Sequence, residues 1–555
     1  MTFHLRPQHA LSALLVALAT ALAAPLAHSQ GAAAGPDQRF APATSGIQAR
    51  FGHALDGAGD RALVGAIGDG ELGTDAGAAH VFERSGAGAT WLEAGKLLAS
   101  DGEAGDEFGY DVALEGDRAL VGAHGWDGAG VVDAGAAYVF ERQADGVWLE
   151  MARLESPVPA PFAHLGWSVD LEGDRALVGA VSDSGAGVFA GAAHLFERQG
   201  DGSWSHVAVL TDPDAQFGDS LGHTVALNGD SAFVGALLDD DAGDSAGAVH
   251  VFERAADGTW NHTDRLTASD ATASARFGQS LAVNGDTLVV GTWINDGADP
   301  GRAYLFERDP SGAWLEAQRL TGIAGSDFFG FGVAADLVGD LCVIGTRRIS
   351  FGASGPGMVR CYERRSDGQW HWVADVAPSS QDSFGRFGAA TAVIGPDEFL
   401  TGAWAATTPT GQLSGAAYST RIGQLMRTRP EVSIDDAGTT DLVLFAGPER
   451  AGSIYFVVGS YTGTSLGFEV DGVTLPIDRD SYTDQCVFDY NGAILTNNLG
   501  LLDGDGTAVV HFRLPKGLDP ALAGVRIWHA AVVISPPVFW PPALVTEPID
   551  VALVP

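Results

Sequence analysis

Acidic and aromatic side chains are the residues of this sequence that could do chemistry. Aspartates gather in Gly-rich segments, and three tryptophans stand near them along the chain. Carboxylates beside aromatic planes suit the binding of sugars, amines or basic protein side chains. The alternative is a solvated acidic surface with indoles packed under loops. The candidate binding residues are Trp126, Trp293, Trp404, Asp127 and Asp296.

One acidic run, "DDDAGDS" from Asp239, is a candidate metal site with Asp239, Asp241 and Asp244 as ligands. Calcium takes six to eight oxygen ligands, and this run matches no established cage spacing. We therefore expect no cofactor and leave calcium open as the one metal that the carboxylates would suit.

Motifs of the common hydrolases and transferases are absent from the sequence. It contains no His-Glu-x-x-His, no Cys-x-x-Cys and no phosphate-binding Gly loop. Because 70 residues are acidic, any single pair of carboxylates is uninformative. We expect no catalytic residues and a protein that is not an enzyme.

Three cysteines are too few for a disulfide scaffold. Cys342 and Cys361 fall on adjacent strands of one expected hairpin, roughly opposite each other, which favours a cross-strand disulfide. Two buried thiols are the alternative. Cys486 would be left unpaired.

A phrase resembling "FGYDVALEGDRALVGAH" occurs seven times and dominates the sequence. Its copies start 54 to 57 residues apart. A constant period of this length is typical of repeat architectures. The starts are Phe51, Phe108, Leu165, Leu221, Phe277, Phe331 and Phe387.

Each copy contains four short segments with strand character. The first two alternate apolar and small residues and are joined by a tight turn such as Asn228-Gly229, a pair favoured in type I′ hairpins. A third segment reads like "GAAHVFER", and a second tight turn leads to a Trp-bearing fourth segment. One such sheet cannot bury both its faces, but seven arranged radially can, which predicts a seven-bladed β-propeller.

The seventh copy lacks a fourth strand, and this gap predicts how the ring closes. In the other copies an aliphatic residue stands eleven positions before the next start. The same count back from Phe51 reaches Phe40. We therefore expect residues 38–44 to complete the last blade.

The recurring Phe-Gly and Gly-Ala pairs resemble the FG-GAP repeats of integrin alpha-subunit propellers and their secreted bacterial relatives. The resemblance covers about residues 38 to 424. It implies a propeller and a role in extracellular binding or adhesion. Integrin blades carry an Asp-x-Asp-x-Asp-Gly calcium cage between their first two strands. This sequence has only "EGD" or "NGD" there, so the calcium sites are not carried over.

Long loops should gather on one rim of the propeller, because strands alternate direction and the other rim has only tight turns. Loops on a rigid scaffold commonly carry recognition. We expect the acidic long-loop face to bind an extracellular protein or a glycan. A channel mouth lined by unlike acids, His and Tyr from several blades would instead favour a hydrolase or lyase with a carbohydrate or other substrate. A purely structural envelope component is the third alternative.

The net charge of −39 disfavours nucleic acid and anionic membrane surfaces as partners. Residues 1–29 read as a secretory signal peptide cleaved near Ser29-Gln30, which places the mature protein outside the cytoplasm, secreted or at the cell surface. No later apolar stretch predicts a membrane span. Residues 30–50 form an N-terminal segment, 51–424 the propeller, and 430–555 a small antiparallel β-sandwich.

Overall fold

The computed structural model describes residues 38–42, 48–86, 90–128, 130–293, 300–322, 329–347, 357–364, 368–377, 386–407 and 414–422, and backbone strands between 425 and 554. By internal contacts the chain divides into two compact units. One unit is Pro36–Arg421, and the other combines Met1–Gly35 with Ile422–Pro555. The predicted signal peptide lies outside the described residues.

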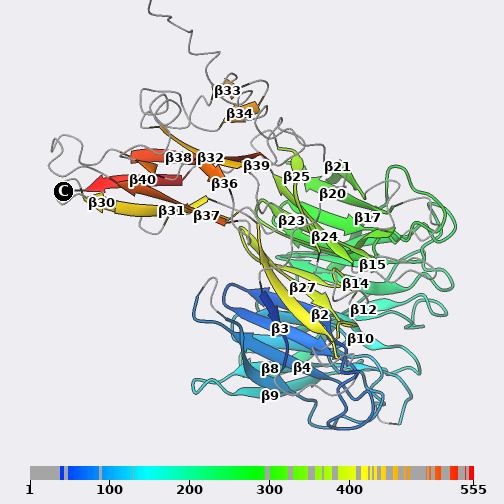
Figure 1. The fold of residues 1–555 in the computed structure, drawn as a ribbon. Coiled ribbons are helices and arrows are strands. Elements are labelled where there is room, and N and C mark those ends of the chain that lie inside the picture. Colours follow the sequence, from blue (N-terminus) through cyan, green and yellow to red (C-terminus); the bar gives the residue numbers. More distant parts are fainter. Residues whose placement is uncertain are drawn as a thin grey trace, which may run out of the picture. The chain divides into compact units, whose positions relative to one another are not determined.

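The unit Pro36–Arg421 is a seven-bladed β-propeller, as the repeat predicts. Each blade is a four-stranded antiparallel sheet, and the blades follow one another in chain order from blue to yellow in Figure 1. The first four blades are β2 (Phe51–Ala58), β3 (Arg61–Ala66), β4 (Ala78–Glu83) and β5 (Leu92–Leu97); β6 (Val112–Glu115), β7 (Arg118–Ala123), β8 (Ala136–Arg142) and β9 (Trp148–Leu154); β10 (Leu165–Glu172), β11 (Arg175–Ala180), β12 (Ala192–Arg198) and β13 (Trp204–Leu210); β14 (Leu221–Asn228), β15 (Ser231–Ala236), β16 (Ala248–Arg254) and β17 (Trp260–Leu266). The last three are β18 (Ser280–Asn284), β19 (Thr287–Gly291), β20 (Arg302–Arg308) and β21 (Trp314–Thr321); β22 (Phe329–Val338), β23 (Leu341–Arg347), β24 (Met358–Arg364) and β25 (Trp370–Val376); β26 (Thr391–Gly395), β27 (Glu398–Ala403) and β28 (Ala416–Arg421), joined by β1 (Gln38–Phe40).

The Phe-Gly and Gly-Ala pairs of the repeat hold neighbouring blades together. Phe51 and its six counterparts are at most 1% exposed. Gly65 of β3 faces Gly109 of the next blade so closely that a Cβ on Gly65 would lie 2.0 Å from the Gly109 carbonyl oxygen. Gly402 and Gly52 repeat this contact between the seventh and first blades, where the distance would be 2.2 Å. Only glycine permits such an approach of two backbones, which explains why the motif recurs.

Strand β1 closes the ring. It pairs antiparallel with β28, so that Phe40 lies opposite Ala417 and Gln38 opposite Ser419. The N-terminal segment thus supplies the fourth strand that the seventh copy of the repeat lacks. The Phe40 ring packs edge-on to Phe82 at 5.0 Å and stacks on Trp91 at 5.5 Å, both in the first blade.

Glu-Arg pairs at the ends of the third strands link the second to sixth blades each to the one before it. Arg142 contacts Glu83 at 3.1 Å, and Arg198 contacts Glu141 at 3.2 Å. Further pairs are Arg254–Glu197, Arg308–Glu253 and Arg364–Glu307. These pairs join adjacent blades, so the recurring "FER" segment contributes to the interfaces of the ring.

The predicted Cys342–Cys361 disulfide is wrong, because both cysteines are buried free thiols. The register of β23 and β24 places Cys361 opposite Val343 and Cys342 opposite Tyr362. Neighbouring residues of a strand point to opposite faces of the sheet, so the two sulfur atoms lie on different faces of the blade. An error of one residue in the expected register accounts for the wrong prediction.

The second unit contains strands β29 to β40, which form two main sheets. One sheet has the order β29 (Leu425–Arg427), β31 (Thr439–Phe445), β37 (Thr507–Arg513) and β35 (Leu495–Thr496). The other has the order β30 (Glu431–Ser433), β40 (Ile549–Val554), β38 (Arg526–Ile534), β32 (Ile454–Ser460) and β36 (Leu499–Leu501), with β39 (Leu544–Val545) beside β38. Strands β33 (Phe468–Val470) and β34 (Val473–Leu475) form a hairpin. The packing of these sheets as a sandwich stays a prediction, and Cys486 lies outside the described residues.

Candidate functional site

The innermost strands of all seven blades enclose one cavity of about 620 Å³ along the propeller axis. The residue after each Phe-Gly or Leu-Gly pair lines it and differs from blade to blade. Volumes of this size are typical of small-molecule sites in proteins. In blade order these residues are His53, Tyr110, Trp167, His223, Gln279, Val333 and Ala389.

Four of these residues form a continuous aromatic crescent on one side of the cavity. Ring centroids are 4.9 Å apart for His53 and Tyr110, 4.7 Å for Tyr110 and Trp167, and 6.0 Å for Trp167 and His223. All four side chains are half-buried. They stand at the start of the first strands. The start of a first strand pairs with the end of the second strand, and the long loop of the blade begins at that end. The crescent therefore forms a mouth at the long-loop end of the channel.

Trp293 and Trp404 extend this mouth, as the sequence led us to expect of a shared rim. Each follows the second strand of its blade and lines the cavity. The Trp404 ring lies 6.3 Å from His53, so it continues the crescent into the seventh blade. We call the set His53, Tyr110, Trp167, His223, Trp293 and Trp404 the channel mouth.

Trp126 does not belong to the channel mouth. It is 7% exposed, its Nε1–H donates to Asp101, and the Arg153 guanidinium stands 4.3 Å from its ring. Trp126 comes three residues after the end of β7, whereas Trp293 and Trp404 come one or two residues after β19 and β27. His124 takes the corresponding place in the second blade, with its ring 4.2 Å from Tyr110. Trp126 thus packs under a loop, which is the alternative weighed from the sequence.

Four aspartates line the channel further along the inner strands. Each accepts a backbone N–H from its own strand and another from the next blade. Asp56, for example, accepts from Gly57 at 2.7 Å and from Leu114 at 2.7 Å. The others are Asp111 with Val112 and Val169, Asp170 with Leu171 and Leu227, and Asp336 with Leu337 and Val393.

The surroundings of these carboxylates favour their neutral form. Enclosure by the inner strands raises the pKa of Asp56 to about 6, because the charged carboxylate loses hydration. The same cause raises the pKa values of Asp111, Asp170 and Asp336 to about 7. Burial, with Arg276 nearby, lowers the pKa of His223 to about 4, so this imidazole is neutral at pH 7.

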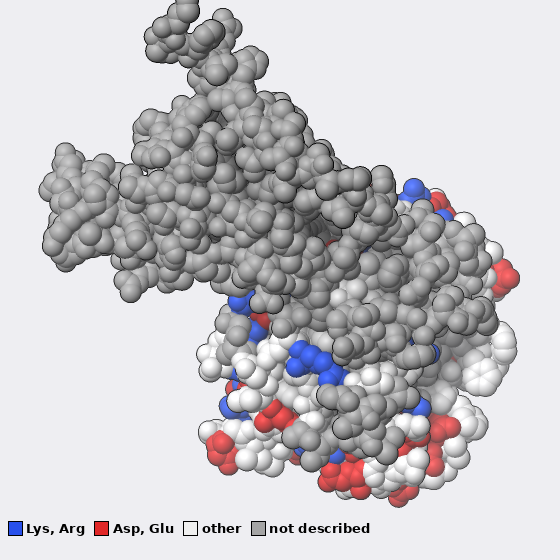
Figure 2. Space-filling view, in the orientation of Figure 1, with Lys and Arg blue, Asp and Glu red and all other residues white. Residues whose placement is uncertain are grey.

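The remaining sequence-predicted binding residues lie elsewhere or are not described. Asp127 is exposed, and its Oδ1 accepts the backbone N–H of Asp133 at 2.8 Å within its own loop. Asp296 lies outside the described residues. Figure 2 shows separate acidic patches, most of them toward the lower edge of the view, among other coloured side chains of the propeller.

The predicted metal ligands Asp239, Asp241 and Asp244 do not converge in the structure. Arg265 pairs with both Asp239 and Asp241, and Gln216 donates to Asp241 at 2.8 Å. Asp244 is exposed. Within the described ranges, the one group of three close metal-ligating side chains is instead Asp212, Asp239 and His250.

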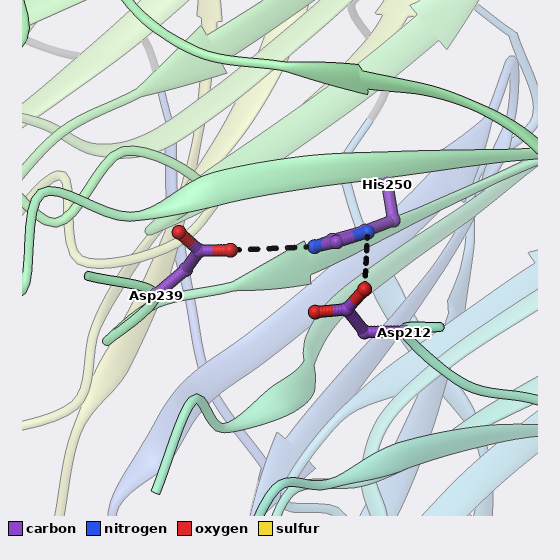
Figure 3. Close-up of side chains that lie close together, drawn as sticks. All are labelled: Asp212, Asp239 and His250. Carbon is purple, nitrogen blue, oxygen red and sulfur yellow. Dashed lines mark ion pairs between the residues drawn. The ribbon is translucent and has the colours of Figure 1, made fainter. Parts of the chain in front are cut away.

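Figure 3 shows the His250 imidazole between the two carboxylates of this group, with one ring nitrogen toward each. Nε2 lies 3.5 Å from Asp239 and Nδ1 lies 3.8 Å from Asp212. Nδ1 also contacts His262 Nε2 at 3.0 Å, and Arg265 donates to Asp239 at 2.8 Å. The two ring nitrogens face different carboxylates, and the Arg265 guanidinium already pairs with Asp239. We therefore interpret the group as a buried polar cluster and not as a metal site.

Comparison with known proteins identifies the repeats. The FG-GAP repeat family matches four stretches, residues 91–140, 148–196, 204–252 and 260–306. Each stretch runs from the outer strand of one blade to the third strand of the next. No curated protein matches the sequence.

Solved structures with detectable likeness include three bacterial or archaeal proteins. A protein from Lactobacillus plantarum has 16% identity and a TM-score of 0.40, covering 59% of this chain and 85% of its own. A protein of unknown function from Dyadobacter fermentans has 11% identity and a TM-score of 0.35, covering 56% and 93%. The β-propeller domain of the Trilobed protease from Pyrococcus furiosus has 8% identity and a TM-score of 0.37, covering 66% and 96%.

Likenesses this distant carry no argument about this chain. Its assignment depends on its own repeats and blades. Among the described residues, no helix has the length and apolar character needed to cross a membrane. Four matched repeats, together with seven blades built on the Phe-Gly and Gly-Ala pairs, show that the chain carries FG-GAP repeats and fits an FG-GAP repeat propeller.

Proposed function

We propose that this chain is a non-catalytic binding protein that works outside the cell and seats its ligand, a glycan or a segment of a protein, in the channel mouth. The proposal depends on one observation: the seven residues that follow the Phe-Gly or Leu-Gly pairs vary among the blades. Positions that only build the ring are nearly identical in every blade. A position that varies from His, Tyr and Trp to Val and Ala around one cavity provides an asymmetric surface, as ligand recognition requires.

Aromatic planes and the neutral imidazole of His223 are well suited to this role. The faces of Tyr110 and Trp167 offer apolar area to a sugar ring or a planar side chain at small entropic cost. Val333 and Ala389, in the sixth and seventh blades, have small side chains that leave room for the ligand. The predicted signal peptide supports action outside the cell.

A steric block of the cavity tests the proposal. The full chain without its signal peptide would be screened on a glycan array and in pull-downs of extracellular proteins. Ala389→Trp fills the mouth without removing a contact, and Val209→Trp adds the same bulk at an exposed site on β13. We expect the first variant to lose captured ligands and the second to retain them. Equal capture by both variants would refute the channel mouth as the site.

A second function, hydrolysis or lyase chemistry in the channel, is favoured by one observation. Asp111 has a pKa near neutrality and lies beside Tyr110 in the lining, and such groups can serve as general acid or base. Against this, both oxygens of Asp111 are engaged, one by the N–H of Val112 in its own blade and the other by that of Val169 in the next blade. Release of new reducing ends or unsaturated products from a bound polysaccharide, abolished in Asp111→Asn, would establish the second function in place of the first.

A further inference from the structure

Two arginines stand at the same structural position beside the channel mouth. Arg276 and Arg386 each directly precede a Phe-Gly pair, in the fifth and seventh blades, and each has a φ of 53°. This left-handed conformation recurs before most first strands of the ring, as at Arg50 and Glu107. The position therefore directs a side chain to the same place in blade after blade.

Each arginine lies over a tryptophan of the channel mouth. The Arg386 guanidinium is 4.3 Å from the centre of the Trp404 ring, and the Arg276 guanidinium is 5.6 Å from that of Trp293. Arg386 is exposed and Arg276 is half-buried. Both distances fall within the range of cation–π contacts, which hold the guanidinium in place without using its N–H groups.

These two arginines lack the acidic partners that most other arginines of the described propeller have. Arg50, Arg84 and Arg265, for example, each contact at least one carboxylate. Within the described part of the chain, neither Arg276 nor Arg386 forms an ion pair or a side-chain hydrogen bond. The protein has 70 acidic and 31 basic residues, so electrostatic attraction favours a carboxylate partner for each guanidinium group. Two guanidinium groups without such a partner beside the channel mouth depart from this expectation. Their ten N–H donors remain available to a ligand.

We propose that the channel mouth binds a glycan end that carries an acidic group, a carboxylate or a sulfate, with Arg276 and Arg386 holding the anion while Trp293 and Trp404 stack on sugar rings. This inference rests on the proposed binding function and names its ligand class. The planar guanidinium fork matches a carboxylate or a sulfate with two parallel hydrogen bonds. The net charge of −39 opposes dense polyanions, so the ligand is a short or sparsely charged chain whose end enters the cavity.

A pair of ligands that differ only in charge provides the direct test. Calorimetric titration of the full mature chain would compare trigalacturonate with its fully methyl-esterified form, and a sulfated galactose trisaccharide would form a third arm. We expect the acid to bind about tenfold or more tightly than the ester, with affinity falling as salt is added. Binding of the sulfated but not the carboxylated sugar would assign the anion as a sulfate.

Arginine variants locate the effect. Arg276→Gln with Arg386→Gln should lower affinity for the acidic sugar about tenfold or more and leave the ester unchanged. Replacing both arginines by Lys keeps the positive charge but removes the planar guanidinium group with its parallel N–H donors. The double Lys variant should therefore recover only part of the affinity that the double Gln variant loses. The control pair Arg153→Gln and Arg319→Gln changes the net charge equally on outer strands β9 and β21 and should have little effect.

Two results would overturn the inference. If acid and ester bind equally, and the double Gln variant binds both as the parent does, the anion has no role while the binding function stands. If neither the carboxylated nor the sulfated sugar binds, acidic glycans are excluded. The binding function is judged separately by the Ala389→Trp screen.

Discussion

Arg84 of the first blade and Glu398 of the seventh form a buried ion pair across the point where the ring closes. The Arg84 Nη2 and Glu398 Oε2 atoms are 3.0 Å apart, and the two side chains are 3% and 5% exposed. Arg84 also lies 4.5 Å from the Trp91 ring, and Glu398 accepts from Ser419 at 2.8 Å. The ion pairs Arg198–Glu141 and Arg254–Glu197, which join other blades, are more exposed to solvent. The pair at the closure of the ring is thus better protected from solvent than these two.

Arg84→Gln should destabilise the propeller by about 3 kcal/mol, because it leaves the Glu398 carboxylate buried with a weakened set of partners. The free energy of unfolding in urea measures the loss. Arg254→Gln breaks the half-exposed pair with Glu197 and should cost about 1 kcal/mol or less. Equal losses in the two variants would mean that the closure is no stronger than the other interfaces.

Phe40→Ala should destabilise the propeller by about 3 kcal/mol, through the loss of its contacts with Phe82 and Trp91. Deletion of residues 36–46 removes the whole strand β1 and should lower the melting temperature further. Val207→Ala, at an exposed site on β13, is the control and should change stability little. An unchanged melting temperature after the deletion would refute closure by β1.

The channel aspartates predict an unusual dependence of stability on pH. The pKa of Asp111 is about 7 in the folded chain and about 3.8 when unfolded, so between these values the folded state holds a proton that the unfolded state has lost. Its contribution is fully present below pH 3.8 and is lost as pH rises to 7. Asp111→Asn cannot titrate, and its side-chain NH2 faces one of the two backbone N–H groups from which the Asp111 carboxyl accepts. The parent's advantage in unfolding free energy over Asp111→Asn should therefore be largest near pH 4 and shrink toward pH 7. An advantage that grows with pH would contradict the raised pKa.

Both Cys342 and Cys361 should react as free thiols once the chain is unfolded. Burial raises the pKa of each thiol above its usual value, so neither should react with a maleimide in the folded chain. Mass spectrometry of non-reduced peptides, with and without denaturant during labelling, provides the readout. A peptide pair linked through the two sulfurs would contradict the observed strand register.

The ring architecture could be predicted from the sequence because its determinants repeat. The spacing of Phe-Gly pairs gives the number of blades, and the missing Trp strand gives the closure by Phe40. The disulfide could not be predicted reliably, because a shift of one residue in register moves a side chain to the other face of a sheet. Cys342 and Cys361 differ from an opposed pair by that single residue.

The channel mouth was only partly predictable. Trp293 and Trp404 line the cavity one or two residues after their second strands, whereas Trp126 comes three residues after β7 and packs under a loop. His53, Tyr110, Trp167 and His223 are not among the residues predicted from the sequence, because their position varies between copies of the repeat. Variation at a fixed position of a closed ring was the available signal, because every such residue must face the same axis.

Affinity for a captured ligand in two tryptophan variants tests the central claim most directly. Trp167→Ala removes the middle of the aromatic crescent, whereas Trp372→Ala removes an indole that is 54% exposed on outer strand β25. We predict that Trp167→Ala weakens binding by about 2 kcal/mol, roughly thirtyfold in Kd, and that Trp372→Ala leaves Kd unchanged. An unchanged Kd for Trp167→Ala in a folded protein would contradict a ligand site in the channel mouth.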